Sequence, residues 1–147
     1  MLVSISRTEY FEAAHLLPEH EKGCGSLHGH SYKLQVEITG PQTEPWGMIM
    51  DYNDLKQAIK EVMPDHKYLH YEGDPRSEDF LAVIKKYNMR YDTFPCATSA
   101  ENMAPILMNR IEDYIQNTLN YKDIQVTKLV LNETKNSECV VRKEYKI

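Results

Sequence analysis

Apolar and polar residues alternate most clearly over residues 31–39, and this alternation predicts a strand with one buried face. The apolar face of this strand carries Tyr32, Leu34, Val36 and Ile38. Residues 2–15 are rich in β-forming side chains and are predicted to form another strand. Two more strands are predicted over 124–134 and 138–145, and a hairpin loop joins them.

Apolar residues at helical spacing predict two main helices in the middle of the chain. Asp51 is a suitable N-cap for the first helix, which is predicted to end at Pro64. Its apolar stripe consists of Leu55, Ala58, Ile59, Val62 and Met63. Thr98 and Glu101 form a capping box before the second helix, and Pro105 predicts a late start or a kink. The second stripe consists of Met103, Leu107, Ile111, Tyr114, Ile115 and Leu119.

The stretch between the two main helices has a weaker pattern. Residues 65–70 are predicted to be a loop, and a short extra helix capped by Ser77 is predicted over 77–88. The resulting order is two strands, two main helices and two strands (ββααββ) in a single domain, residues 1–147. This order predicts an α+β fold, in which a four-stranded antiparallel sheet carries the two main helices on one face.

Charge and composition argue against several classes of protein. The net charge of −5 disfavours a nucleic-acid partner, because a phosphate backbone calls for a basic face. No apolar run approaches the roughly 20 residues that cross a bilayer, and the first residues lack the features of a signal peptide. The three cysteines, an odd number, do not suit a disulfide framework. We therefore expect a cytoplasmic protein without a membrane or nucleic-acid partner.

Three histidines fall on strand faces that also carry apolar residues. His28 and His30 are two residues apart, in phase with the apolar face of the strand that follows them. His15 ends another predicted strand, on the face that carries Phe11 and Ala13. Three neutral imidazoles can bind Zn²⁺ and leave the fourth position open, as in catalytic zinc sites. The alternative is three ordinary core or surface histidines, because spacing alone does not place His15 near the pair.

Cys24 has three interpretations. It lies between Gly23 and Gly25, four residues before His28, on a backbone that can turn tightly. It can be a fourth zinc ligand, which would close the site, or a free thiolate whose pKa a neighbouring cation lowers. It can also be a small loop residue without chemistry. The other two cysteines, Cys96 and Cys139, lack such neighbours and are interpreted as structural.

Two acidic positions are further candidates. Asp65 precedes His66 directly, and a carboxylate beside a histidine can orient its ring for acid–base chemistry. The alternative is a solvated polar loop. Glu133 continues the inward face of Leu129 and Leu131, where a carboxylate needs a partner. A ligand with paired N–H donors would supply one, and the alternative is a frayed strand end.

Six segments together resemble a known family. In order along nearly the whole chain, they are FEAAHLLPEH, CGSLHGHSYK, GMIMDYNDLK, DHKYL, TSAEN and VLNET. They resemble the signature segments of the 6-pyruvoyl-tetrahydropterin synthase superfamily. The C-x-x-x-H-G-H spacing resembles the branch of 6-carboxy-tetrahydropterin synthases, which act in the pathway to queuosine and other 7-deazaguanines. The pyruvoyl enzymes have a longer gap at this point, and another branch has Glu in place of the cysteine.

The resemblance implies a role for each candidate residue. The implied zinc ligands are His15, His28 and His30. The implied acid–base residues are Cys24, as the proton-abstracting base, and His66, supported by Asp65. The implied pterin contacts are Glu133, which anchors the ring and is grouped with the catalytic residues, and, near the pocket, Ser99 and Glu101.

The resemblance also implies a fold, an assembly and a reaction. The fold is the tunnelling fold, in which subunits join their sheets into a barrel, and the assembly is a homohexamer of two trimers with active sites between subunits. The substrate is 7,8-dihydroneopterin triphosphate, which reacts with water to give 6-carboxy-5,6,7,8-tetrahydropterin, acetaldehyde and triphosphate. Residues 71–97 are longer than usual and are expected to be an insert. A pyruvoyl-type lyase and a non-catalytic zinc-binding module, with Cys24 as fourth ligand, stay as alternatives.

Overall fold

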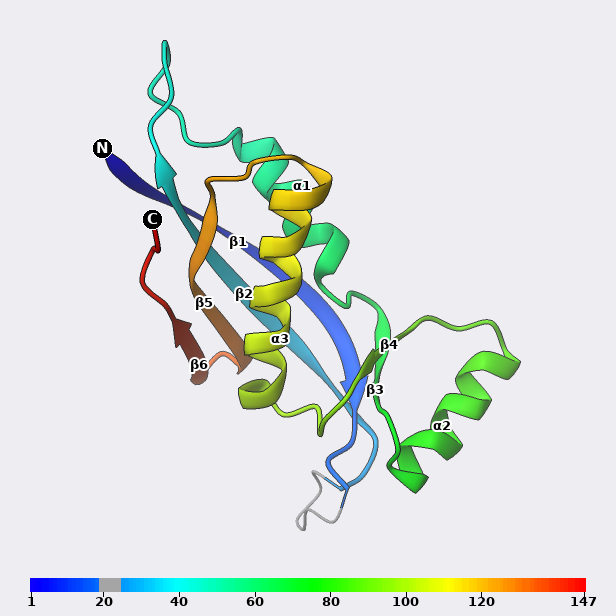
Figure 1. Ribbon diagram of the computed structural model, residues 1–147. Coiled ribbons are helices and arrows are strands. Elements are labelled where there is room, and N and C mark those ends of the chain that lie inside the picture. Colours follow the sequence, from blue (N-terminus) through cyan, green and yellow to red (C-terminus); the bar gives the residue numbers. More distant parts are fainter. Residues whose placement is uncertain (19–24) are drawn as a thin grey trace.

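A computed structural model describes residues 1–18 and 25–147 of the chain. The described part consists of one mixed β-sheet and three α-helices, and the third helix continues into a π-helical turn (Figure 1). The strands are β1 (Leu2–His15), β2 (His28–Pro41), β3 (Lys67–Tyr71), β4 (Tyr91–Phe94), β5 (Gln125–Thr134) and β6 (Ser137–Arg142). The helices are α1 (Tyr52–Val62), α2 (Pro75–Lys86) and α3 (Ala100–Asp113), with the π-helical turn at Tyr114–Thr118.

The sheet has the strand order β4-β3-β1-β2-β5-β6. The four predicted strands are confirmed as the antiparallel series β1-β2-β5-β6, and the α+β class is confirmed with them. The predicted number of strands is wrong, because β3 and β4 add two parallel strands beside β1. Tyr68 of β3 packs in a small cluster with Leu81 of α2, whereas the next residue, Leu69, belongs to the main core. Because β3 is buried on both faces, it lacks the alternation that would have predicted it.

β1 and β2 form a long antiparallel ladder that positions the candidate site. Their register runs from Leu2 opposite Pro41 to His15 opposite His28. Ala13 lies opposite His30 in the same ladder. The end of β1 and the start of β2 therefore meet at one end of the sheet, and the three histidines meet with them.

α1 and α3 cover one face of the sheet, and the main core lies between them and the sheet (Figure 1). Asp51 caps α1 as predicted, because its carboxylate accepts the N–H of Asn53 at 2.7 Å. The cap of α3 is Ser99 rather than Thr98, and its hydroxyl accepts the N–H of Asn102. Pro105 lies inside α3, which begins at Ala100, so the late start is wrong and the alternative, a kink, stays a prediction.

α2 confirms the extra helix but not its predicted cap. Asp74 caps it, and its carboxylate accepts the N–H of Ser77, which is buried. α2 lies beside β3, away from the other two helices (Figure 1). The last strand ends at Arg142 rather than at the predicted Tyr145. Within residues 1–18 and 25–147, none of the helices combines the length and apolar character needed to cross a membrane.

Candidate functional site

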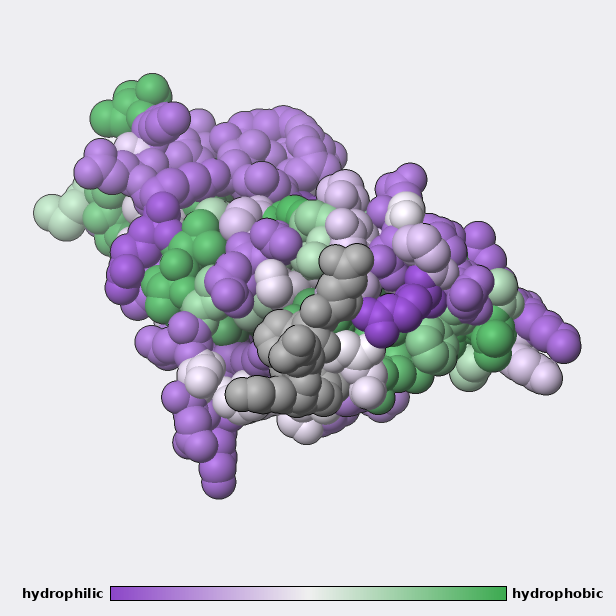
Figure 2. All heavy atoms as spheres, turned by 90° about the horizontal axis from the view of Figure 1, so that it is seen from below, coloured by the Kyte–Doolittle hydropathy of each residue, from purple (hydrophilic) through white to green (hydrophobic). Residues whose placement is uncertain are grey.

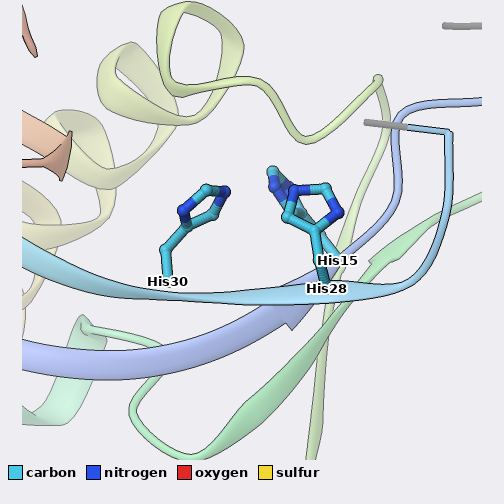
Figure 3. Close-up of side chains that lie close together, drawn as sticks. All are labelled: His15, His28 and His30. Carbon is cyan, nitrogen blue, oxygen red and sulfur yellow. The ribbon is translucent and has the colours of Figure 1, made fainter. Parts of the chain in front are cut away.

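Three imidazole rings converge at the end of the β1–β2 ladder (Figure 3). His28 and His30 project from β2 on one face, and His15 from the end of β1 joins them. One ring nitrogen of each histidine lies within 4.8 Å of those of the other two. The structure therefore brings together the three residues that the sequence suggested as a metal site.

Hydrogen bonds orient two of the rings toward a shared point. Nδ1 of His15 donates to the carbonyl oxygen of Thr98 at 2.9 Å, and Nδ1 of His28 donates to the carbonyl oxygen of Ser26 at 2.7 Å. A neutral ring that carries its proton on Nδ1 has a lone pair on Nε2. Nε2 of His15 is buried and has no hydrogen-bond partner among the described residues. This arrangement leaves nitrogen lone pairs available for a cation.

Burial keeps the imidazole of His15 neutral. Burial lowers the pKa of His15 to about 4, and proximity to His28 and His30 acts in the same direction. Burial also lowers the pKa of His30, although the carboxylate of Glu133 opposes this shift. His15 is therefore neutral near pH 7, which is the form that binds a metal ion.

Glu133 at the end of β5 lies beside the histidine cluster. Its Oε1 is 3.5 Å from Nε2 of His15 and 3.7 Å from Nε2 of His30. Both distances are too long for hydrogen bonds, and the contact with neutral His15 is not an ion pair. Below the cluster, the ring of Tyr32 lies 5.5 Å from that of His30. Burial and Glu133 raise the pKa of the Tyr32 phenol, so it stays protonated.

Asp65 and His66 contact each other rather than the cluster. Nδ1 of His66 lies 2.9 Å from Oδ1 of Asp65, which also accepts the backbone N–H of Glu12 at 3.0 Å. Burial alone would raise the pKa of Asp65, but these two donors hold it below its ordinary value. His66 adopts a left-handed φ of 56°, and its side chain is 69% exposed. In the described ranges no recorded contact links this pair to the three histidines.

A cleft of about 690 Å³ is lined by one residue of the histidine cluster and by one residue of the Asp65–His66 pair. Its walls include His30, Ser31 and His66, and the volume suits a small organic ligand. Residues of the stretch 71–97 complete it, and these are Ile84, Asn88, Met89 and Arg90. The sequence pattern did not single out these four. On the molecular face nearest this end of the sheet, apolar side chains gather over α2, where Phe80 is exposed (Figure 2).

The remaining candidates have different positions. Ser99 directly follows Thr98, whose carbonyl oxygen orients His15, and Glu101 is exposed in the first turn of α3. Burial and the charge of Glu101 raise the pKa of the Cys139 thiol. Cys24 lies outside the described residues, and its role stays a prediction.

Comparisons with known proteins agree on one family. The family model of 6-pyruvoyl tetrahydropterin synthase matches residues 4–144. A 6-carboxy-5,6,7,8-tetrahydropterin synthase of Haemophilus influenzae is 31% identical over 144 residues, which cover 94% of this chain and 97% of that protein. The enzyme of the same name from Rickettsia conorii is 28% identical, over 92% of this chain and 96% of its own length.

Solved structures show the same fold. A protein of Wolinella succinogenes superposes with a TM-score of 0.75 at 19% identity, covering 98% of this chain and 99% of the other. The 6-pyruvoyl tetrahydropterin synthase of Plasmodium vivax superposes with a TM-score of 0.71 at 14% identity, covering 97% and 98%. The expected tunnelling fold is therefore confirmed, with a sheet that has more strands than predicted.

Proposed function

The chain belongs to the 6-pyruvoyl tetrahydropterin synthase family and is a lyase, and from this premise we propose that it is a zinc-dependent 6-carboxytetrahydropterin synthase. Its substrates are 7,8-dihydroneopterin triphosphate and water. Its products are 6-carboxy-5,6,7,8-tetrahydropterin, acetaldehyde and triphosphate, and it acts in the biosynthesis of 7-deazaguanines such as queuosine. The observation that carries the proposal is the histidine cluster, of which His30 also lines a cleft of substrate size.

The donor set fits Zn²⁺. His15, His28 and His30 supply three nitrogen donors, and the buried Nε2 of His15 has no other partner among the described residues. Three neutral imidazoles with a fourth position open are typical of catalytic zinc. Bound zinc would act as a Lewis acid toward the oxygen atoms of the substrate side chain. The residues around it would orient that side chain and move its protons.

Two residues are proposed for proton transfer, and a third orients one of them. Cys24 removes a proton from the substrate side chain as a thiolate, which a cation nearby would favour. His66 gives or takes the second proton, and its place on the wall of the cleft lets a ligand there reach it. Asp65 orients the His66 ring through the contact at Nδ1. Because the backbone N–H of Glu12 also holds Asp65, this carboxylate is fixed relative to the sheet.

Binding of the pterin ring is proposed for Glu133, beside the histidine cluster, and for residues at the start of α3. Glu133 accepts two N–H bonds from the aminopyrimidine edge, a charge-assisted pair that is stronger than a neutral one. Ser99 and Glu101 lie at the start of α3 and are proposed to contact the ring as well. Ser99 stands directly after Thr98, so a ligand contact at α3 is coupled to the orientation of His15.

We also propose a homohexamer of two trimers. β1 pairs with β3 only at Ala13 and Ala14, so most of its outer edge is unpaired in the described chain. β6 is the opposite edge of the sheet. Unpaired edges join readily to strands of another chain, and joining these two edges would continue the sheet from subunit to subunit.

Substitution of Cys24 separates this proposal from a structural zinc module. In Cys24→Ala, release of acetaldehyde from dihydroneopterin triphosphate should stop while the zinc content stays at the level of the unmodified protein. Cys96→Ala is the matched control and should retain both. Loss of zinc from Cys24→Ala would identify the cysteine as a ligand and contradict its role as base.

A further inference from the structure

The contact between Glu133 and His15 brings two hydrogen-bond acceptors together. Thr98 accepts the proton on Nδ1 of His15, so Nε2 presents a lone pair to the Glu133 oxygen 3.5 Å away. The second distance, 3.7 Å to Nε2 of His30, is also longer than the roughly 2.7–3.2 Å of a hydrogen bond. Two lone pairs that face each other repel unless a cation lies between them.

The same distances suit two ligands of one metal ion. Zinc binds histidine nitrogen and carboxylate oxygen at about 2.0–2.2 Å, and tetrahedral angles then separate neighbouring ligand atoms by about 3.3–3.5 Å. The two distances from Glu133 Oε1 lie at or just above this range. A cation at the centre of the cluster would therefore meet the carboxylate without a large movement of β5.

We propose that Glu133 is the fourth metal ligand in the substrate-free protein and that the substrate displaces it. The inference rests on the proposed zinc enzyme and adds a second position for the residue proposed to bind the pterin ring. In the resting protein the carboxylate closes the site. When oxygen atoms of the substrate side chain bind the metal, the carboxylate is released and accepts the N–H donors of the ring.

The position of Glu133 allows such an exchange. It lies near the end of β5, where the pairing with β6 is irregular between Leu131 and Thr134. Its side chain is 30% exposed, whereas the side chain of His15 is fully buried. A carboxylate at a loosely paired strand end can change rotamer at low cost, while a buried histidine held by Thr98 cannot.

Zinc affinity in the absence of substrate tests the proposal. The unmodified protein, Glu133→Gln and the control Glu61→Gln are titrated against a zinc chelator, and no turnover is measured. The control removes an exposed carboxylate of α1, outside the proposed site, and makes the same change in net charge. We expect Glu133→Gln to bind zinc about 10- to 100-fold more weakly and Glu61→Gln to bind it unchanged. Equal affinities in all three proteins would overturn the proposal.

Cobalt substitution gives an independent readout. The visible spectrum of Co²⁺ reports coordination number and ligand type, so Glu133→Gln should change the spectrum of the substrate-free protein. An identical spectrum in both proteins would overturn the proposal. These results also separate the two proposals. If Glu133→Gln binds zinc more weakly but the unmodified protein releases no acetaldehyde, Glu133 is a metal ligand and the proposed lyase reaction is refuted. If the unmodified protein is active and Glu133→Gln binds zinc normally, only the proposal that Glu133 is a ligand is refuted.

Discussion

Protonation of His15 should destabilise the metal-free protein as the pH falls. Its side chain is fully buried, and burial lowers its pKa from the ordinary 6.5 to about 4. The unfolded chain binds this proton near pH 6.5, whereas the folded chain resists it down to pH 4. The contribution of neutral His15 to the free energy of unfolding is therefore complete above pH 6.5 and is lost as the pH falls from 6.5 to 4. At about 1.4 kcal/mol per pH unit, the loss reaches about 3 kcal/mol.

Urea unfolding of chelator-treated protein measures this loss. The free energy of unfolding is compared at pH 7.5 and pH 4 for the unmodified protein and for His15→Gln, whose amide does not titrate. Every other ionisable side chain is present in both proteins, so the difference between the two losses isolates the contribution of His15. We expect the unmodified protein to lose about 3 kcal/mol more than the variant. Equal losses would refute the reasoning, because burial would then not disfavour the charged imidazole.

Three further substitutions test packing around the site and the sheet. The Tyr32 hydroxyl is buried without a partner among the described residues, so Tyr32→Phe should leave urea stability unchanged or raise it by about 1 kcal/mol, and a clear loss would contradict this. A Cβ on Gly40 would overlap Cδ1 of Ile124, so Gly40→Ala should lower the melting temperature, and adding Ile124→Val should restore part of it. Arg110 of α3 donates to both carboxylate oxygens of Asp92 in β4 at 3.0 Å. Arg110→Met should therefore lower the free energy of unfolding in urea by about 1–3 kcal/mol. An unchanged free energy would show that this link between α3 and β4 is dispensable.

Local periodicity predicted the elements that have one buried face. β2 alternates strictly and α1 carries a helical stripe, so both were found with bounds close to those observed. β3 and β4 were missed for a physical reason. They are short, and their parallel partners lie far away along the chain, so no local pattern marks them. The cap of α3 was misplaced by one residue because Thr98 and Ser99 both carry a hydroxyl that suits an N-cap.

The candidate site was predictable only in its parts. Strand phase put His28 and His30 on one face, but the ladder register that brings His15 opposite His28 is a long-range property. The phase of Glu133 indicated an inward carboxylate, and its distance from the histidines depends on the pairing of β5 with β2. Asp65 and its neighbour His66 were candidates because they are adjacent in the sequence, and their acid–base role stays a prediction; the contact of Asp65 with the backbone N–H of Glu12 in β1 is again a long-range property.

Identification of the reaction products tests the central proposal most directly. The zinc-loaded protein is incubated with 7,8-dihydroneopterin triphosphate, and the products are identified by mass spectrometry. The account predicts 6-carboxy-5,6,7,8-tetrahydropterin together with acetaldehyde and triphosphate, and none of the three from protein with His28→Ala. A pyruvoyl-type product without acetaldehyde would contradict the proposed reaction, and unchanged substrate would contradict the proposal as a whole.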